Sequence, residues 1–298
     1  MNKPISINTL SLAILTSLGF IWGSGYVIAR FCMTHGVQPL GYSFWQSLGP
    51  ALFLSLVLLL RKTALPISAA HIRYYILSGL FGIALPNTLM YFSAQHLPAG
   101  LLAVLVNTVP LLTYPLALLF AQEKFSAARL MAVVIGMSGI MVLVLPGAEF
   151  SSDYLFPWGV IVLLTPLSFA LISIYIAAFR PAQGDSLAFS AGMLITSAIA
   201  LLPLMLLTHS FQPLWPMNLP GGMILLEIVL SSIGYILFFA LIKRAGPVYY
   251  SLVGGIVSLT GLFWGYTLFH ETLNLRSSIA IACILVAVIL VTIQRNKK

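Results

Sequence analysis

The sequence predicts an all-α polytopic membrane protein with ten transmembrane helices, arranged as a 5+5 inverted repeat around a central cavity. Three observations predict this fold. Hydrophobic residues make up 60% and charged residues only 7% of the 298-residue chain, which leaves too little polar surface for a water-soluble domain. Apolar runs of about twenty residues, long enough to cross a bilayer, recur along the whole chain. The third observation is an internal repetition.

This repetition relates the two halves of the chain. An apolar run, a short polar hinge and a second apolar run follow one another over residues 98–145 and again over 246–293. Glu123 and Glu271 stand in the two hinges, about half the chain length apart. The duplication is inferred from matching helix lengths and hinge positions, because the other identities at this offset are few, chiefly Leu111 with Leu259 and Ala132 with Ala280.

Ten membrane spans are predicted from the lengths of the apolar runs. The first follows Lys3 and is expected to be uncleaved, because it is too long for a signal peptide and lacks a small-x-small cleavage site. The spans group into two five-helix repeats, 9–146 and 157–294. They are expected at 9–30, 39–60, 74–95, 98–120, 127–146, 157–179, 187–207, 222–242, 247–269 and 277–294.

The basic residues predict the orientation of the spans. With the N-terminus in the cytoplasm, twelve Lys and Arg residues face the cytoplasm, and only Arg30 and Arg276 lie outside. Because each repeat has an odd number of spans, the second enters the membrane in the opposite sense to the first. We expect a multi-pass protein of the bacterial cytoplasmic (inner) membrane with both termini in the cytoplasm. The net charge of +8 sets this topology and indicates no nucleic-acid partner.

Polar residues inside the spans gather at one depth. By position within their helices they form a layer about 8 to 14 Å below the outer surface of the hydrocarbon. Single amides in such a layer also serve as ordinary hydrogen-bonding groups between helices. Spans one, three, four, six, eight and nine are expected to line the cavity, with spans five and ten at the periphery. The layer contains Trp22, Gln46, Asn87, Asn107, Thr165 and Glu227.

Helical spacing groups these residues into polar faces. Glu227, Ser231, Gly234 and Tyr235 share one face of an otherwise apolar span. Two further spans show the same arrangement. These faces contain Asn87, Tyr91 and Gln95 in the third span and Asn107 and Tyr114 in the fourth.

Glu227 is the acidic residue deepest within an apolar run. A charged side chain at such depth costs about 2.5 to 3.5 kcal/mol on insertion scales, so a packing role is a poor explanation. Two roles remain open. The carboxyl group either exchanges protons during a transport cycle or pairs with a cationic group of the cargo.

Catalytic and cofactor motifs are missing from the sequence. It contains no Ser-His-Asp set, glycine-rich nucleotide loop, carboxylate pair or CxxC motif. We therefore predict neither enzymatic activity nor a cofactor or metal site. The expected partners are a small-molecule substrate and the lipid bilayer, with the proton as a candidate coupling ion, in a monomer or homodimer.

The sequence resembles the drug/metabolite transporter (DMT) superfamily, specifically the tandem EamA-domain proteins. The resemblance covers nearly the whole chain. It is carried by WGSGY at 22–26, by NTLMYFSAQHLPAG at 87–100 before a helix with Pro110, by a Gly-rich helix after Glu123, and by a second copy, RAGPVYYSLVGGIVSLTGLFWGYTLFHE, that ends at Glu271. The chain departs from the family pattern at two positions. Gln46 stands where many relatives have an arginine, which argues against a strictly anionic substrate, and Ser258 stands where a proline is usual.

The resemblance implies a secondary active transporter that works by alternating access. The expected function is export of small metabolites such as amino acids or related zwitterionic or aromatic compounds. The alternatives are an importer of a host metabolite and a non-transporting membrane scaffold or receptor. An intramembrane lipid-modifying enzyme would need paired acids or a histidine in the polar layer. The predicted substrate-binding residues are Trp22, Gln46, Asn87, Tyr91, Asn107, Tyr114, Thr165, Glu227, Ser231 and Tyr235.

Overall fold

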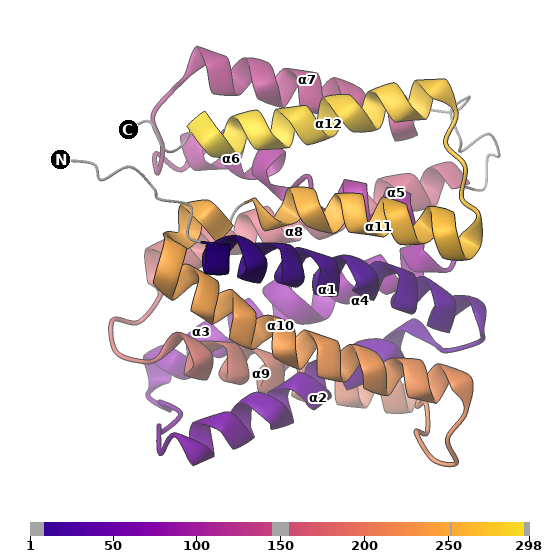
Figure 1. Ribbon diagram of the computed structural model, residues 1–298. Coiled ribbons are helices and arrows are strands. Elements are labelled where there is room, and N and C mark those ends of the chain that lie inside the picture. Colours follow the sequence, from indigo (N-terminus) through magenta and orange to yellow (C-terminus); the bar gives the residue numbers. More distant parts are fainter. Residues whose placement is uncertain (1–8, 145–154, 251, 295–298) are drawn as a thin grey trace.

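The computed structural model describes residues 9–144, 155–250 and 252–294, and all regular secondary structure in these ranges is helical (Figure 1). The predicted all-α polytopic fold is confirmed. The elements are α1 (Thr9–Thr34), α2 (Pro39–Leu60), α3 (Ala69–Gly79), the π-helical turn η1 (Leu80–Ala84), α4 (Leu85–Ala94), α5 (Ala99–Val106), α6 (Val109–Leu119), α7 (Ala127–Val144), α8 (Leu155–Phe179), α9 (Ser186–Leu207), α10 (Leu219–Tyr250), α11 (Val253–Phe269) and α12 (Leu275–Gln294).

Ten helical segments of these elements correspond to the predicted spans. Eight are long and apolar enough to cross a membrane, including the joined segments Ala69–Ala94 and Ala99–Leu119, and two are the shorter apolar helices α7 and α11. The predicted start of the ninth span at residue 247 is wrong, because α10 continues past this position to Tyr250. Proline ends a transmembrane helix less reliably than a soluble one, and Pro247 does not interrupt α10.

Some predicted positions lie outside the described residues. They are the end of the fifth span and of the first repeat at 146, together with Lys3, Arg295, Lys297 and Lys298.

Helix packing repeats between the two halves of the chain. The helix pair α7 and α12 packs along one edge of the bundle, at the top of Figure 1, and α2 and α9 pack along the opposite edge. Between these edges α1 packs on α10 and α11, just as its counterpart α8 packs on α4 and α6. This exchange of partners is expected for a duplicated unit. The first turn of α1 and the last turn of α12 lie on the same side, at the left of Figure 1.

The fourth span is interrupted between α5 and α6. Pro110 supplies no backbone N–H, and two residues in turn conformation, Asn107 and Thr108, separate the helices. The N–H of Asn107 donates to the carbonyl of Ala103 over 3.2 Å, and the Thr108 hydroxyl donates to the carbonyl of Leu105 over 2.6 Å. The break therefore places the Asn107 side chain beside irregular backbone in the middle of the span.

The third span contains the π-helical turn η1 just before Pro86. Because Pro86 has no N–H, a carbonyl group in the preceding turn lacks its helical donor. Helix α8 supplies donors to this region. The Ser168 hydroxyl donates to the carbonyl of Phe81 over 2.6 Å, and the Thr165 hydroxyl donates to the carbonyl of Pro86 over 3.0 Å. These bonds fasten α8 to the irregular part of the third span.

Close contact between α1 and α11 depends on glycine. A Cβ atom at Gly23 would lie 2.5 Å from the Cβ of Thr260 and 2.8 Å from the carbonyl oxygen of Val257. A larger residue here would push the two helices apart. The WGSGY sequence therefore sets the spacing of these two helices.

Candidate substrate-binding site

Glu227 is the centre of the polar region inside the bundle. Its side chain projects from α10 and is only 7% exposed. The Ser231 hydroxyl, one helical turn later, donates to Glu227 Oε1 over 3.0 Å. Neither of the two ion pairs recorded in the described ranges involves Glu227, so no basic side chain there pairs with it.

Gly25 of α1 makes room for this carboxyl group. A Cβ atom at Gly25 would lie 2.7 Å from Glu227 Oε1 and 3.3 Å from Cδ. Real Cβ atoms do not approach other atoms so closely. The helix-packing motif WGSGY thus has a second role, because its second glycine leaves space for the buried acid.

Two tyrosines and a cysteine surround the Glu227 carboxyl group. Tyr42 of α2, Tyr91 of α4 and Cys32 of α1 are all close enough to interact electrostatically with it. The rings of Tyr42 and Tyr91 meet edge to face with centroids 4.6 Å apart. The acid therefore lies near groups on α1, α2 and α4 as well as on its own helix, α10.

Gln46 lies one helical turn after Tyr42 on α2. Its Nε2 donates to the carbonyl of Ile224 over 3.4 Å, and Ile224 is one turn before Glu227 on α10. Gln46 and Glu227, which the sequence placed in one layer, are thus neighbours across the α2–α10 contact.

Aromatic side chains extend the site toward the other end of α10. The ring of Trp22 lies 6.4 Å from that of Tyr235, 6.1 Å from that of Phe238 and 6.2 Å from that of Tyr250. The absence of a side chain at Gly234 lets the indole pack directly on α10. These rings provide an apolar wall that suits a flat or hydrocarbon part of a ligand.

Asn107 connects the interrupted fourth span to α1. Its Nδ2 donates to the hydroxyl of Tyr26 over 3.2 Å and to the carbonyl of Ala103 over 2.8 Å. Tyr26 in turn interacts electrostatically with Tyr91. Asn107 therefore links the break between α5 and α6 to Tyr26 of α1 by a hydrogen bond.

Three predicted residues lie differently. Asn87 is half-buried one turn before Tyr91 on α4. Thr165 is fully buried and bonded to the backbone of Pro86, so it joins two helices. Tyr114 lies beside the α6–α7 loop, where its hydroxyl accepts the N–H of Ser126 over 2.7 Å.

Sequence analysis did not select Gly25, Tyr26, Cys32 or Tyr42 as site residues. For Gly25 and Tyr26 a signal was available, because both belong to the WGSGY sequence four residues or fewer from Trp22. Tyr42 is one turn before Gln46 and shares its helical face, but it lies near the end of its span, outside the predicted layer.

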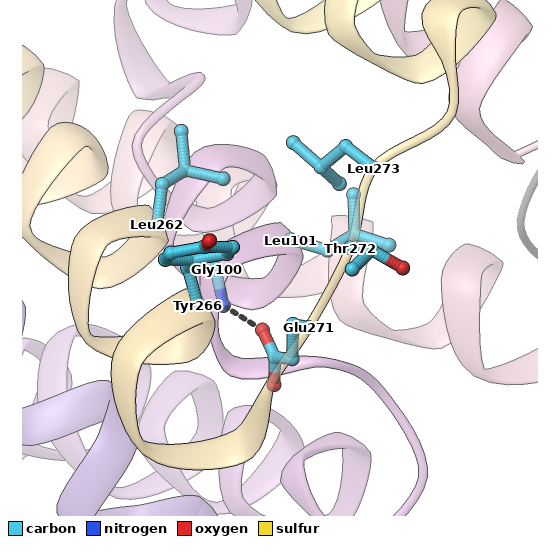
Figure 2. A pocket seen from close by; sticks show the side chains of 7 residues that line it. All are labelled: Gly100, Leu101, Leu262, Tyr266, Glu271, Thr272 and Leu273. Carbon is cyan, nitrogen blue, oxygen red and sulfur yellow. Dashed lines mark hydrogen bonds between the residues drawn. The ribbon is translucent and has the colours of Figure 1, made fainter.

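An ion pair lies at one end of the bundle, near a separate pocket. Glu271 accepts the N–H groups of Ala99 and Gly100, over 2.7 and 3.0 Å, and so caps the start of α5. Figure 2 shows the bond to Gly100. Arg30 Nε lies 3.3 Å from Glu271 Oε1, and Arg30 Nη1 donates to the carbonyl of Leu97. The pocket has a volume of about 340 Å³ and is lined by Gly100, Leu101, Leu262, Tyr266, Glu271, Thr272 and Leu273.

The other hinge glutamate also forms an ion pair. Arg129 Nη1 lies 3.2 Å from Glu123 Oε2, and the guanidinium group stacks over the Tyr114 ring at 3.9 Å from its centroid. Each hinge of the duplicated chain is thus held by an arginine, although Arg30 and Arg129 do not occupy equivalent positions in the two repeats.

No group of three His, Cys, Asp or Glu side chains comes together as a metal site in the ranges 9–144, 155–250 and 252–294.

The fold of this chain is similar to that of a solved structure. A crystal structure of a protein with 15% sequence identity superposes on this chain with a TM-score of 0.61. The superposition covers 97% of this chain and 99% of the chain in that crystal structure. At this identity the likeness concerns the fold alone.

Curated relatives match almost the full length of the chain. Protein PecM of Dickeya dadantii is 26% identical over 274 residues, covering 91% of this chain and 88% of PecM. The uncharacterized inner membrane transporter YedA of Escherichia coli K12 is 28% identical over 291 residues, covering 94% of this chain and 90% of YedA. The transporter YoaV of Bacillus subtilis is 23% identical over 295 residues, covering 95% and 97%.

The family comparison agrees with the internal duplication. Residues 9–145 match the EamA-like transporter family, and residues 157–293 match it a second time. The two matches together span nearly the whole chain, so the chain belongs to the EamA-like transporter family as a tandem, multi-pass member.

Proposed function

We propose that the protein is a secondary active transporter that exports small metabolites, such as amino acids or related zwitterionic or aromatic compounds, across the bacterial inner membrane. Relatives named as transporters, one of them as an inner membrane transporter, support this assignment. The observation that carries the proposal is the Glu227 carboxyl group, buried between four helices beside an aromatic wall.

The chemistry of the site fits a ligand with a polar end and an apolar end. Glu227, Gln46 and Asn107 offer charge and hydrogen bonds, whereas Trp22 and Tyr235 offer aromatic surface. Small-molecule sites combine a mostly apolar lining with a few placed polar groups in this way. Alternating access between the two repeats would expose the site to each side of the membrane in turn.

Transport in proteoliposomes tests the proposal. The purified protein is expected to accumulate or release members of an amino acid and metabolite panel, with rates that depend on Glu227. A proton gradient is imposed in one series and omitted in the other. If no compound in the panel crosses the membrane of the proteoliposomes faster than that of protein-free liposomes, the transporter assignment fails. A scaffold or receptor role then explains the protein better.

The Glu227→Gln variant separates the two roles of the acid. If Glu227 carries protons, the variant loses gradient-driven accumulation but retains exchange, because the amide resembles the protonated acid. If Glu227 pairs with a cationic cargo, the variant loses binding itself. Asp185→Asn is the matched control, because Asp185 is exposed and only caps α9 through the N–H of Leu187. Wild-type accumulation and exchange in Glu227→Gln would make the acid a bystander.

A further inference from the structure

Three polar atoms on helices α2 and α10 have no hydrogen-bond partner within the described part of the chain. They are Glu227 Oε2, Gln46 Oε1 and Tyr42 Oη. Their side chains are 7%, 8% and 0% exposed, so bulk water does not substitute for a partner. Buried polar groups are nearly always satisfied, and an unpaired one calls for a ligand, an ion or a water.

The positions of the three side chains bring them to the contact between α2 and α10. Tyr42 and Gln46 are four residues apart on α2 and therefore share a face. Gln46 Nε2 binds the carbonyl of Ile224, three residues before Glu227 on α10, and Tyr42 interacts electrostatically with Glu227. Helices α2 and α10 pack on each other.

Neighbouring donors are already in use. The Ser231 hydroxyl donates to the other carboxyl oxygen, Glu227 Oε1. The Cys32 thiol is directed to the carbonyl of Pro220, 3.8 Å away. The amide of Gln46 is oriented by its bond to Ile224, because a flipped amide would place two oxygen atoms against each other. The unpaired atom of Gln46 is therefore an acceptor, the unpaired oxygen of Glu227 is an acceptor when the carboxyl group is ionised, and Tyr42 Oη can accept as well.

A group that satisfies three acceptors next to an acid must carry several N–H donors and a positive charge. A primary ammonium group has three donors and no acceptor. A quaternary ammonium group has the same charge but no donor, and water has two donors and no charge.

We infer that Tyr42, Gln46 and Glu227 form a subsite for the primary ammonium group of the cargo. The inference rests on the proposed transport function in treating the ligand as cargo, and it narrows the substrate class to compounds with a free –NH₃⁺ group. It also assigns Tyr42, which faces the acid from α2, as a specificity residue.

Binding of paired amines to the purified full-length protein tests the subsite. The probes are phenethylamine, tyramine and L-phenylalanine, each beside its N,N,N-trimethyl counterpart, which keeps the charge and the ring but lacks N–H donors. We expect the wild type to bind at least one primary amine about tenfold or more tightly than its counterpart, since replacing the donors leaves buried acceptors unpaired.

Substitutions locate the preference. Tyr42→Phe and Gln46→Leu each remove one acceptor and are expected to reduce the preference for the primary amine several-fold, with little effect on the trimethyl compound. The matched control is Tyr75→Phe. Tyr75 Oη is likewise buried without a partner within the described residues, but it lies on α3 against Phe189, so the preference should stay at the wild-type value. Melting temperatures verify that every variant is folded.

Several results would overturn the inference. One is equal binding of a primary amine and its trimethyl counterpart, and another is the same change in Tyr42→Phe as in Tyr75→Phe. A stabilisation by sodium chloride over choline chloride that disappears in Glu227→Gln would assign the subsite to sodium instead. Failure of every primary amine to bind also overturns it.

The outcomes distinguish this inference from the transport proposal. Transport of neutral or anionic compounds without amine binding would leave the transporter assignment standing and remove the subsite. Tyr42-dependent amine binding without movement of any compound would do the opposite.

Discussion

Single residues decide whether the buried acid can occupy its place. Glu227 fits against α1 only because residue 25 has no side chain. The closeness of a hypothetical Cβ atom to Oε1 makes this contact more restrictive than ordinary helix packing, and it makes Gly25 a position where a single methyl group should affect function.

Gly25→Ala is expected to displace the Glu227 carboxyl group and to reduce transport at least about tenfold, with a stability loss of about 1 to 3 kcal/mol typical of overpacking. Transport rate and melting temperature are measured together. Gly222→Ala is the control, since a Cβ atom at Gly222 of α10 meets nothing within 4 Å, and both quantities should stay near wild type. Full activity of Gly25→Ala would show that the carboxyl position is not critical.

Asn107 gives a second prediction at the residue scale. Asn107→Leu removes the donor to Tyr26 and is expected to weaken substrate binding while the melting temperature stays nearly unchanged, because the side chain is only partly buried and its bonds are few. Tyr26→Phe removes the same bond from the other side and should weaken binding in parallel. If stability collapses while affinity is kept, Asn107 only packs the helix break.

At the scale of helices, sequence periodicity predicted which faces are polar but not which polar residues meet. Glu227, Ser231 and Tyr235 do share a face, and Gln46 does reach α10. Depth alone, however, does not distinguish a residue that lines a cavity from one that hydrogen-bonds to backbone groups of a neighbouring helix. Thr165 was placed in the layer by its depth, but its hydroxyl satisfies backbone beside the π-helical turn, and that turn has no clear sequence signal apart from Pro86.

The cap on α5 gives a prediction at the same scale. Glu271→Ala leaves the N–H groups of Ala99 and Gly100 without their acceptor and is expected to destabilise the protein by about 1 to 3 kcal/mol. Glu271→Gln keeps an acceptor oxygen and should cost less. Thermal unfolding in detergent measures both, and Asp185→Asn serves as an exposed control. Equal losses for the two Glu271 variants would mean that the ion pair with Arg30 matters and the cap does not.

At the scale of the whole molecule, composition and run lengths were sufficient to predict the helix number and the duplication. The largest boundary errors lie between the eighth and ninth spans, where the chain stays helical to Tyr250, and at the start of the third span, which begins at Ala69 and not at 74. The sequence did not predict which helices pack against each other. The packing of α7 with α12 and of α2 with α9 brings together small residues far apart in sequence, such as Gly139 with Ala280 and Ser47 with Ser197, and a hydropathy pattern does not pair such residues.

The inverted relation of the repeats makes a prediction about four exposed positions. His35 and Gln183 occupy corresponding places in the two repeats, at the same sequence offset as Lys124 and Thr272, and all four are exposed. Since an odd number of spans separates corresponding positions, the members of each pair should lie on opposite sides of the membrane. The native cysteines Cys32 and Cys283 lie within helices and are not fully exposed, so an impermeant maleimide should reach them poorly.

Labelling of variants with one introduced cysteine, in intact cells, measures this topology. His35→Cys and Thr272→Cys are expected to react with the impermeant maleimide in intact cells, because few basic residues flank these loops. Lys124→Cys and Gln183→Cys should react only after permeabilisation, on the side where most Lys and Arg residues lie. Labelling of both members of a pair from the same side would make the repeats parallel. If all four positions are labelled in the opposite pattern, the repeats are still inverted but both termini lie outside the cell. The direction of transport would then have to be determined anew.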